Sequence, residues 1–131
     1  GIYGGGFSLY MNVNDLLKVA ELCLHQGKFK QKQMVSAEWM KQMHTAYKIV
    51  HQEGNDEYGY GFQWWTMAGN DETYEYQCIY AAGLFGQYII LVPELKIFAV
   101  VKSQLDPSLQ TIPLELIKEL LISAKNNLLQ A

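Results

Sequence analysis

Residues 74–104 constrain the fold more than any other part of the chain, because they hold three short runs rich in β-branched and aromatic side chains. These runs are residues 74–80, 88–92 and 97–102. A Gly83-x-x-Gly86 turn separates the first two runs, and residues 93–96, which read Pro-Glu-Leu-Lys, separate the last two. Runs of this length and composition, bounded by turn residues, predict three antiparallel strands in a meander.

The second and third runs are nearly continuous in apolar residues. Strands with this pattern are covered on both faces, so we expect helices to lie against the sheet. The C-terminal segment is the main candidate, because its apolar residues fall on one helical stripe. This stripe consists of Leu114, Ile117, Leu120, Leu121, Ala124 and Leu128. A helix over residues 113–128 would be about 24 Å long at 1.5 Å per residue, which is enough to cross a sheet.

Two shorter helices are expected before the sheet. Asn12 is a typical N-terminal cap, and the apolar stripe that follows it ends at Gly27. Ser36 is placed to cap a second, short helix. The lysine-rich residues 28–32 between them predict a charged loop in solvent, and residues 47–56 predict a polar loop.

Residues 58–64 alternate between aromatic residues and residues of other kinds. The aromatic positions are Tyr58, Tyr60, Phe62 and Trp64, and the positions between them are Gly59, Gly61 and Gln63. This alternation predicts a further strand, with a glycine face that admits close approach of another backbone. The aromatic row either belongs to the core or lines a substrate cleft. Residues 67–73 predict a turn before the meander.

The predicted fold class is therefore α+β, as a single domain over residues 1–131. Two N-terminal helices precede an antiparallel sheet of three to four strands, and a long C-terminal helix packs on that sheet. Half of the residues are apolar, so the chain can bury a core of its own.

Composition excludes several classes of partner. The net charge of −3 with scattered lysines argues against a nucleic-acid partner, and no apolar run approaches the roughly 20 residues of a membrane span. Cys23 and Cys78 are expected as buried small hydrophobic residues, with a disulfide between them or a reactive thiol as the less favoured alternative. His44 and His51 are expected on the surface. No spacing predicts a metal site, and no motif predicts a cofactor.

Five blocks of the sequence, taken together and in their order along the chain, are more specific than any one of them alone. They are Gly4-Gly-Gly-Phe-Ser8, Asp15-Leu-Leu-Lys18, residues 27–36, Tyr58-Gly-Tyr-Gly-Phe-Gln-Trp64, and Gly83-Leu-Phe-Gly-Gln-Tyr-Ile89 with Val92-Pro-Glu-Leu95. Together they resemble the C-terminal part of the serine hydrolases that share the β-lactamase and penicillin-binding-protein fold. The closest likeness is to the class C β-lactamase-like branch, which also contains esterases and amide hydrolases. The resemblance covers nearly all of this chain and implies that the chain matches about the last third of a family member.

The resemblance implies a Ser nucleophile three residues before a Lys, whose amine activates the hydroxyl. The residues three positions after Ser8, Ser36, Ser103, Ser108 and Ser123 are Met11, Trp39, Asp106, Thr111 and Asn126, so this motif is absent. Tyr10-Met-Asn12 matches the family's Tyr-x-Asn motif, but it follows the glycine block instead of preceding it. We therefore interpret that match as accidental.

The family's third motif is Lys or His, then Thr or Ser, then Gly, on a strand that walls the active site. Here the corresponding residues are 78–80 or 81–83, and neither set holds a cationic side chain. A backbone N–H needs no particular side chain, so Tyr80, Ala82 and Gly83 are candidates for half of an oxyanion hole. Tyr60, Trp64 and Gln87 are candidates for substrate contact.

Two functional classes remain open from the sequence. The chain is either part of a hydrolase that acts on amide, ester or lactam bonds, or a non-catalytic binding module that has kept the fold. In both cases we expect no independent catalysis. Two further strands complete the sheet in the family, so one edge is expected to be bare, with a second copy of the chain or a missing N-terminal segment as its partner. A small-molecule substrate is expected only in the full-length context.

Overall fold

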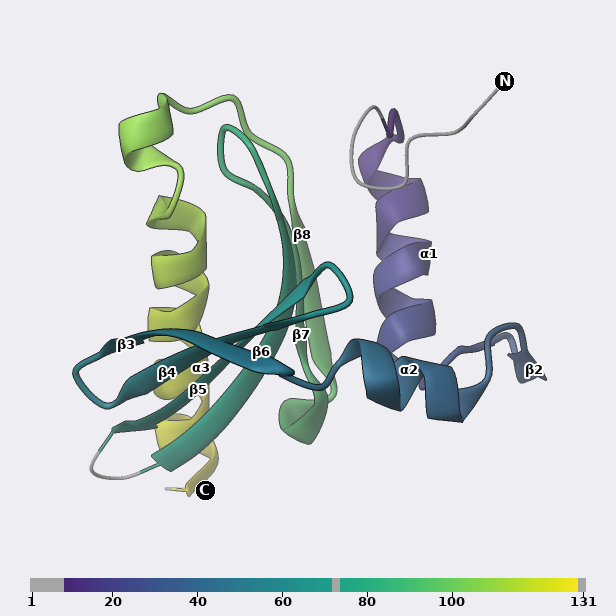
Figure 1. Cartoon of the computed structure of the whole chain (residues 1–131), viewed down its shortest axis with the longest axis horizontal. Coiled ribbons are helices and arrows are strands. Elements are labelled where there is room, and N and C mark those ends of the chain that lie inside the picture. Colours follow the sequence, from purple (N-terminus) through teal and green to yellow (C-terminus); the bar gives the residue numbers. More distant parts are fainter. Residues whose placement is uncertain (1–8, 72–73, 130–131) are drawn as a thin grey trace.

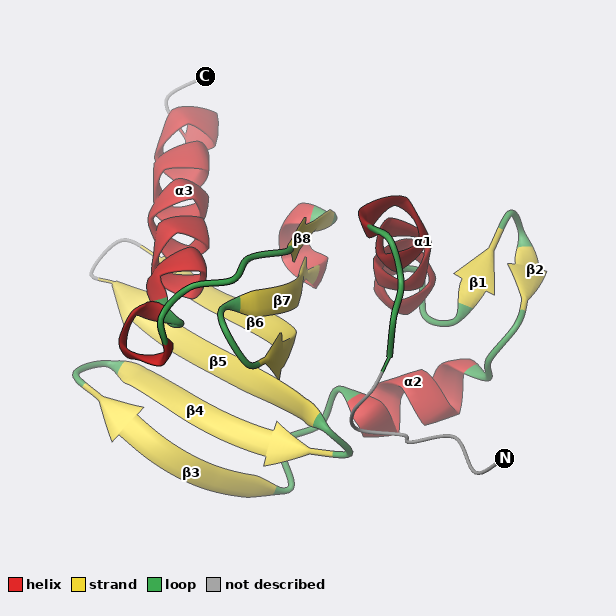
Figure 2. Cartoon of the chain, turned by 90° about the horizontal axis from the view of Figure 1, so that it is seen from above, coloured by secondary structure: helices red, strands yellow, loops and turns green. Residues whose placement is uncertain are grey.

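The computed structural model of the chain describes residues 9–71 and 74–129. In this part of the chain a six-stranded antiparallel sheet carries helices on both faces, and a two-stranded hairpin lies apart from it (Figures 1 and 2). The helices are α1 (Val13–Leu24), α2 (Ala37–Met43) and α3 (Ile112–Leu129). The strands are β1 (Lys28–Phe29), β2 (Lys32–Gln33), β3 (Lys48–Glu53), β4 (Asp56–Gly61), β5 (Trp64–Asp71), β6 (Tyr74–Gly83), β7 (Gln87–Val92) and β8 (Ile97–Val101). The predicted α+β class is confirmed.

The predicted meander is also confirmed, since β6, β7 and β8 are consecutive antiparallel neighbours. The β6–β7 turn reverses through Phe85 and Gly86, both at positive φ. The Ser103 hydroxyl donates to the Phe85 carbonyl oxygen at 2.7 Å, and the Leu105 N–H donates to the same oxygen at 3.0 Å. The segment after β8 therefore ties down the tip of the hairpin.

The sheet has six strands, so the prediction of three to four was too low. Residues 47–56 were predicted as a loop but contain β3, and its side chains are all exposed. An edge strand with no buried face shows no apolar alternation, so the pattern carried no signal for it. Residues 28–32, also predicted as a loop, form most of the β1–β2 hairpin.

The prediction of one aromatic-faced strand over residues 58–64 was wrong. The chain reverses at Phe62 and Gln63, where Gln63 has a φ of 67°, and Trp64 pairs back to Gly61. Residues 67–73 were predicted as a turn, yet β5 continues to Asp71; residues 72 and 73 lie outside the described residues. The tight reversal was not expected because neither turn residue is a glycine or a proline.

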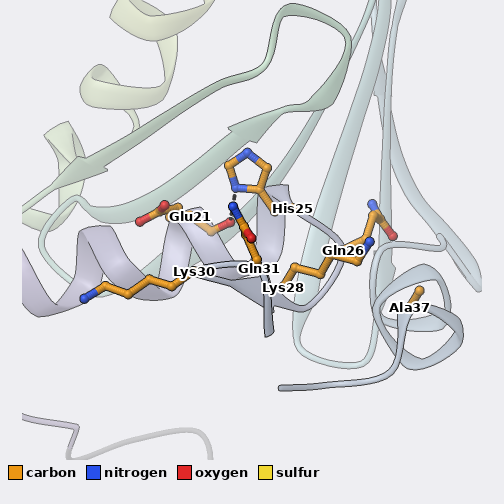
Figure 3. Close-up of a pocket in the computed structure, with 7 residues that line it drawn as sticks. All are labelled: Glu21, His25, Gln26, Lys28, Lys30, Gln31 and Ala37. Carbon is orange, nitrogen blue, oxygen red and sulfur yellow. Dashed lines mark hydrogen bonds between the residues drawn. The ribbon is translucent and has the colours of Figure 1, made fainter. Parts of the chain in front are cut away.

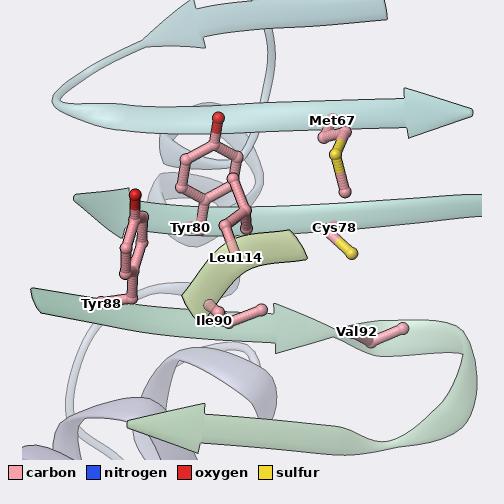
Figure 4. Packing of buried hydrophobic residues seen from close by; sticks show 7 residues of the cluster. All are labelled: Met67, Cys78, Tyr80, Tyr88, Ile90, Val92 and Leu114. Atoms are coloured by element: carbon pink, nitrogen blue, oxygen red, sulfur yellow. The ribbon is translucent and has the colours of Figure 1, made fainter. Parts of the chain in front are cut away.

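Two apolar layers cover the sheet, as the continuous apolar strands predicted. The layer under α3 consists of Met67, Cys78, Tyr80, Tyr88, Ile90, Val92 and Leu114 (Figure 4). The layer under α1 and α2 consists of Ala20, Cys23, Met40, Trp64, Ile79 and Leu91. Cys23 and Cys78 are buried in opposite layers and both are free thiols, so the expectation of two buried hydrophobic cysteines is confirmed.

The predicted helix boundaries follow from local hydrogen bonds. Asn12 Oδ1 accepts the Asp15 N–H at 2.9 Å, and Ser36 Oγ accepts the Trp39 N–H at 3.2 Å. Gly27 has a φ of 81° after α1 ends, as a helix-stopping glycine does. No helix in the described part of the chain is long and apolar enough to cross a membrane.

The predicted packing of the C-terminal helix on the sheet is confirmed for its first turns only. Leu114 is buried and Ile117 packs against the same layer, but Leu120 is 63% exposed although it was placed on the apolar stripe. The side chains of Leu121, Ala124 and Leu128 are outside those described. The glycine block at residues 4–6 likewise lies outside the described residues.

Gly61→Ala should destabilise the fold, because the glycine face of β4 lies directly against the preceding segment. A Cβ at Gly61 would sit 2.1 Å from the Thr45 carbonyl oxygen, whereas one at Gly83 would meet nothing nearer than Gln87 Cβ at 3.4 Å. We expect Gly61→Ala to lower the free energy of unfolding by about 1–3 kcal/mol. Urea denaturation measures the loss, and Gly83→Ala is the control. Equal stability of the two variants would contradict the close packing at Gly61.

Candidate functional site

A pocket of about 420 Å³ lies between the sheet and the start of α3. Its lining from the sheet consists of His51, Glu53, Tyr58, Trp65, Tyr80, Ala82, Gly83 and Tyr88. Its lining from the helix side consists of Gln110, Thr111, Leu114 and Glu115. Because four of these side chains are large aromatic rings, we call it the aromatic pocket.

The rings come from neighbouring strands and form a row across the sheet. Tyr60 and Trp65 are register partners with ring centroids 4.7 Å apart, and Trp65 and Tyr80 are partners with centroids 6.3 Å apart and planes 13° apart. Tyr80 and Tyr88 follow at 6.1 Å. Figure 4 shows the Tyr80 and Tyr88 hydroxyls both directed across the sheet, toward its β5 side. Cross-strand pairing, and not spacing along one strand, therefore assembles this row.

The phenols in the pocket are neutral near pH 7. Burial raises the pKa of Tyr58, Tyr80 and Tyr88, and the Glu115 carboxylate raises the pKa of all three further. The Tyr88 hydroxyl donates to the Gln110 carbonyl oxygen at 2.9 Å. This bond connects β7 to the segment that leads into α3.

An ion pair holds α3 against the pocket. The Lys118 ammonium contacts the Asp56 carboxylate of β4, and both side chains are largely buried. One turn earlier on α3, Leu114 packs into the apolar layer between the rings (Figure 4). The helix is thus fixed by apolar contact and by charge at the same point.

The three candidates for an oxyanion hole all line this pocket. β5 pairs with β6 only as far as Tyr80, so within residues 9–71 and 74–129 the strand partner of Ala81, Ala82 and Gly83 is β7 alone. Successive residues of a strand turn their N–H groups to opposite sides, so at least one of these three directs its N–H away from β7. That donor lies on the side of β6 that β5 leaves uncovered.

The three candidates for substrate contact are separated in space. The Tyr60 ring contacts the Trp65 ring at one end of the row, with the two planes tilted by 59°. Trp64 is buried in the opposite layer, beside His44. Gln87 lines a different hollow near Lys102, and its side-chain amide donates to the Leu84 carbonyl oxygen at 3.2 Å. The structure therefore does not bring the six predicted residues into one site.

Sequence reasoning missed Trp65, Tyr88 and Glu115 as pocket residues. Trp65 follows Trp64 directly, so only the strand register decides which of the two faces α3. Glu115 reaches the pocket from a helix that starts twenty residues after the end of β7. The available signal was weak: an acidic residue in the first turn of a helix that was expected to cross the sheet.

A second hollow, of about 600 Å³, lies between the end of α1 and the β1–β2 hairpin (Figure 3). Lys28 and Lys30 line it but extend in opposite directions, and the His25 ring contacts the Glu21 carbonyl oxygen of its own helix at 3.0 Å. Because its charged groups do not converge, we regard the aromatic pocket as the candidate site.

Comparison with known proteins does not identify the chain: no protein-family model and no curated protein matches it. Within residues 9–71 and 74–129, no group of three or more His, Cys, Asp or Glu side chains is arranged to hold a metal ion. The function therefore has to be argued from the geometry and from the resemblance.

His44 was predicted at the surface, and that prediction was wrong. It is 9% exposed, its ring meets the edge of Trp64 at a centroid distance of 5.4 Å, and neither ring nitrogen has a hydrogen-bond partner among the described residues. His44 caps the end of α2, and the turn brings it under the sheet. Its polar neighbours in the sequence gave no sign of this burial.

The burial of His44 should make stability depend on pH. Burial lowers the pKa of His44 in the folded chain, so the unfolded chain binds a proton more readily. Stability should fall as the pH drops from about 6.5, the usual histidine value, toward the lowered pKa, and be fully present above that window.

Urea denaturation between pH 5 and pH 8 measures this effect. We expect His44→Leu to lose less stability on acidification than the unaltered chain. A difference of one unit between the folded and unfolded pKa of His44 corresponds to about 1.4 kcal/mol in the free energy of unfolding. His51→Gln, at an exposed histidine, is the control and should behave like the unaltered chain. An identical pH profile for His44→Leu would contradict the assignment.

Proposed function

We propose that this chain is the C-terminal part of a serine hydrolase related to the class C β-lactamase-like branch. The observation that carries the proposal is the strand segment of residues 81–83, which among the described residues pairs on one side only and lies where the resemblance puts the wall of an active site. The ordered sequence blocks and the antiparallel sheet with a C-terminal helix on one face support it.

In this proposal the chain contributes charge stabilisation, and a segment outside it contributes the nucleophile. Attack of a serine oxygen on an amide, ester or lactam carbonyl leaves a negative charge on the carbonyl oxygen, which a backbone N–H near Ala82 or Gly83 stabilises. Removal of one such donor typically lowers the rate by about 100- to 1000-fold.

Three serines of the described residues have structural roles. Ser36 caps α2, the Ser103 hydroxyl donates to the β6–β7 turn, and the Ser108 hydroxyl donates to the Asp106 carboxylate at 2.6 Å. None of the three has a lysine three residues later in the sequence. These serines therefore lack the base that serine acylation requires.

The chain on its own should be inactive toward hydrolase substrates. Incubation with nitrocefin, a p-nitrophenyl ester and a fluorophosphonate should give no turnover, and intact mass spectrometry should show no covalent adduct. The gene product that includes the upstream sequence should be labelled by the fluorophosphonate, on a serine that precedes residue 1. An adduct on a serine of residues 1–131 would contradict the proposal.

The alternative is a non-catalytic binding module, and the aromatic pocket favours it because one chain alone builds that pocket. The gene distinguishes the two functions. A reading frame that continues about 200 residues upstream, the size of a further domain, favours the hydrolase. A gene start just before Gly1 favours the module.

We further propose that the β8 edge of the sheet pairs with another strand, from a second copy of the chain or from an N-terminal segment. The two edges differ in character. β3 carries a bulge between Ile49 and His51 and has no buried side chain, whereas β8 pairs with β7 in unbroken register and holds only apolar residues. Bulges and polar side chains discourage edge pairing, and β8 has neither.

The edge proposal predicts self-association through β8. Multi-angle light scattering at rising protein concentration should show a mass that approaches two chains, and Ile97→Lys should shift it toward one chain. Ile49→Lys on β3 is a matched control, because the two isoleucines are 42% and 47% exposed. A single-chain mass at every concentration would contradict pairing between copies.

A further inference from the structure

The rim of the aromatic pocket is acidic. Glu53 and Glu115 both line it, and no lysine is among the described residues that do. Of the lining residues only His51 can carry a positive charge, and its ring lies 3.9 Å from Glu53, with both side chains mostly exposed. The nearby Lys118 is already paired with Asp56. An anionic ligand would therefore be repelled from this pocket, and a cationic one attracted.

The interior of the same pocket is aromatic. Tyr58, Trp65, Tyr80 and Tyr88 line it, one from each of the four successive strands β4, β5, β6 and β7. The faces of tyrosine and tryptophan rings attract cations within about 6 Å of the ring centre, and most strongly where water is excluded. Ala82 and Leu114 add apolar surface that suits methyl or methylene groups. Rings and carboxylates in one concave site favour an organic cation over a bare metal ion.

Glu115 lines the pocket together with the four rings. Burial raises the pKa of Tyr58, Tyr80 and Tyr88, and the Glu115 carboxylate raises the pKa of each further. Glu115 is also in the first turn of α3, where a carboxylate is held by the helix dipole. A cation seated among the rings would have this carboxylate as its counter-charge.

We propose that the aromatic pocket binds a small organic cation, a quaternary ammonium or protonated amine, between the tyrosine and tryptophan faces and Glu115. The volume of about 420 Å³ is in the range of small-molecule sites. This binding goes beyond the hydrolase proposal, because it needs neither a nucleophile nor an oxyanion hole. It can therefore succeed or fail independently of that proposal.

The experiment is an NMR titration of the chain with choline at pH 7.5, which follows the three tryptophan indole N–H signals. We expect a saturable shift of the Trp65 signal, with smaller shifts for Trp39 and Trp64, which do not line the pocket. The uncharged isostere 3,3-dimethylbutan-1-ol has the same shape and should bind at least about tenfold more weakly, since 1.4 kcal/mol of charge-dependent binding is a factor of ten.

Two variants on α3 test whether Glu115 is the carboxylate that pairs with the bound cation. Glu115→Gln should weaken choline binding about three- to tenfold while leaving the unfolding transition in place, because Glu115 is exposed. Glu119→Gln, one turn further along α3 and outside the pocket lining, is the matched control and should bind choline like the unaltered chain. The proposal is overturned by equal affinity for choline and the alcohol, by unchanged binding in Glu115→Gln, or by the absence of a saturable Trp65 shift.

Discussion

Burial of both faces of the sheet is the constraint on which the rest of the structure depends. Along β7, Tyr88, Ile90 and Val92 belong to the layer under α3, and Leu91 belongs to the layer under α1 and α2. Each such side chain contributes on the order of 1.5–3 kcal/mol only if it is removed from water. A strand of this kind is stable only between two covers, and these covers come from opposite ends of the chain.

The candidate pocket arises where one of these covers is incomplete. Leu114 and Ile117 of α3 pack on the middle of the sheet, and the ion pair from Lys118 to Asp56 holds the helix there. Beside the helix, the aromatic row continues toward the end of β6 that β5 does not pair. Tyr58 and Trp65 are only partly buried beside the helix, whereas Tyr80 and Tyr88 belong to the core, which explains why the pocket is both aromatic and close to residues 81–83.

Much of the fold was predictable from local chemistry, and most of the candidate site was not. Asn12, Ser36 and Gly27 act through hydrogen bonds and dihedral angles within a few residues, so the sequence predicted where the first two helices start and where the first one ends. β3 was missed because an exposed edge strand needs no apolar pattern. His44 was misplaced because its burial comes from the path of the chain after α2 and not from its neighbours in the sequence.

The sequence by itself determined the antiparallel meander, its need for cover on both faces and the helix that supplies one cover, because apolar periodicity and turn residues act over short distances. Only the tertiary structure decided which rings share a face. The reversal at Phe62 and Gln63 sends Trp64 and Trp65 to opposite layers, and the strand register then places Trp65 beside Tyr80. A side chain's partner across a sheet depends on the strand register. A slip of one residue would move each side chain of the strand to the opposite face.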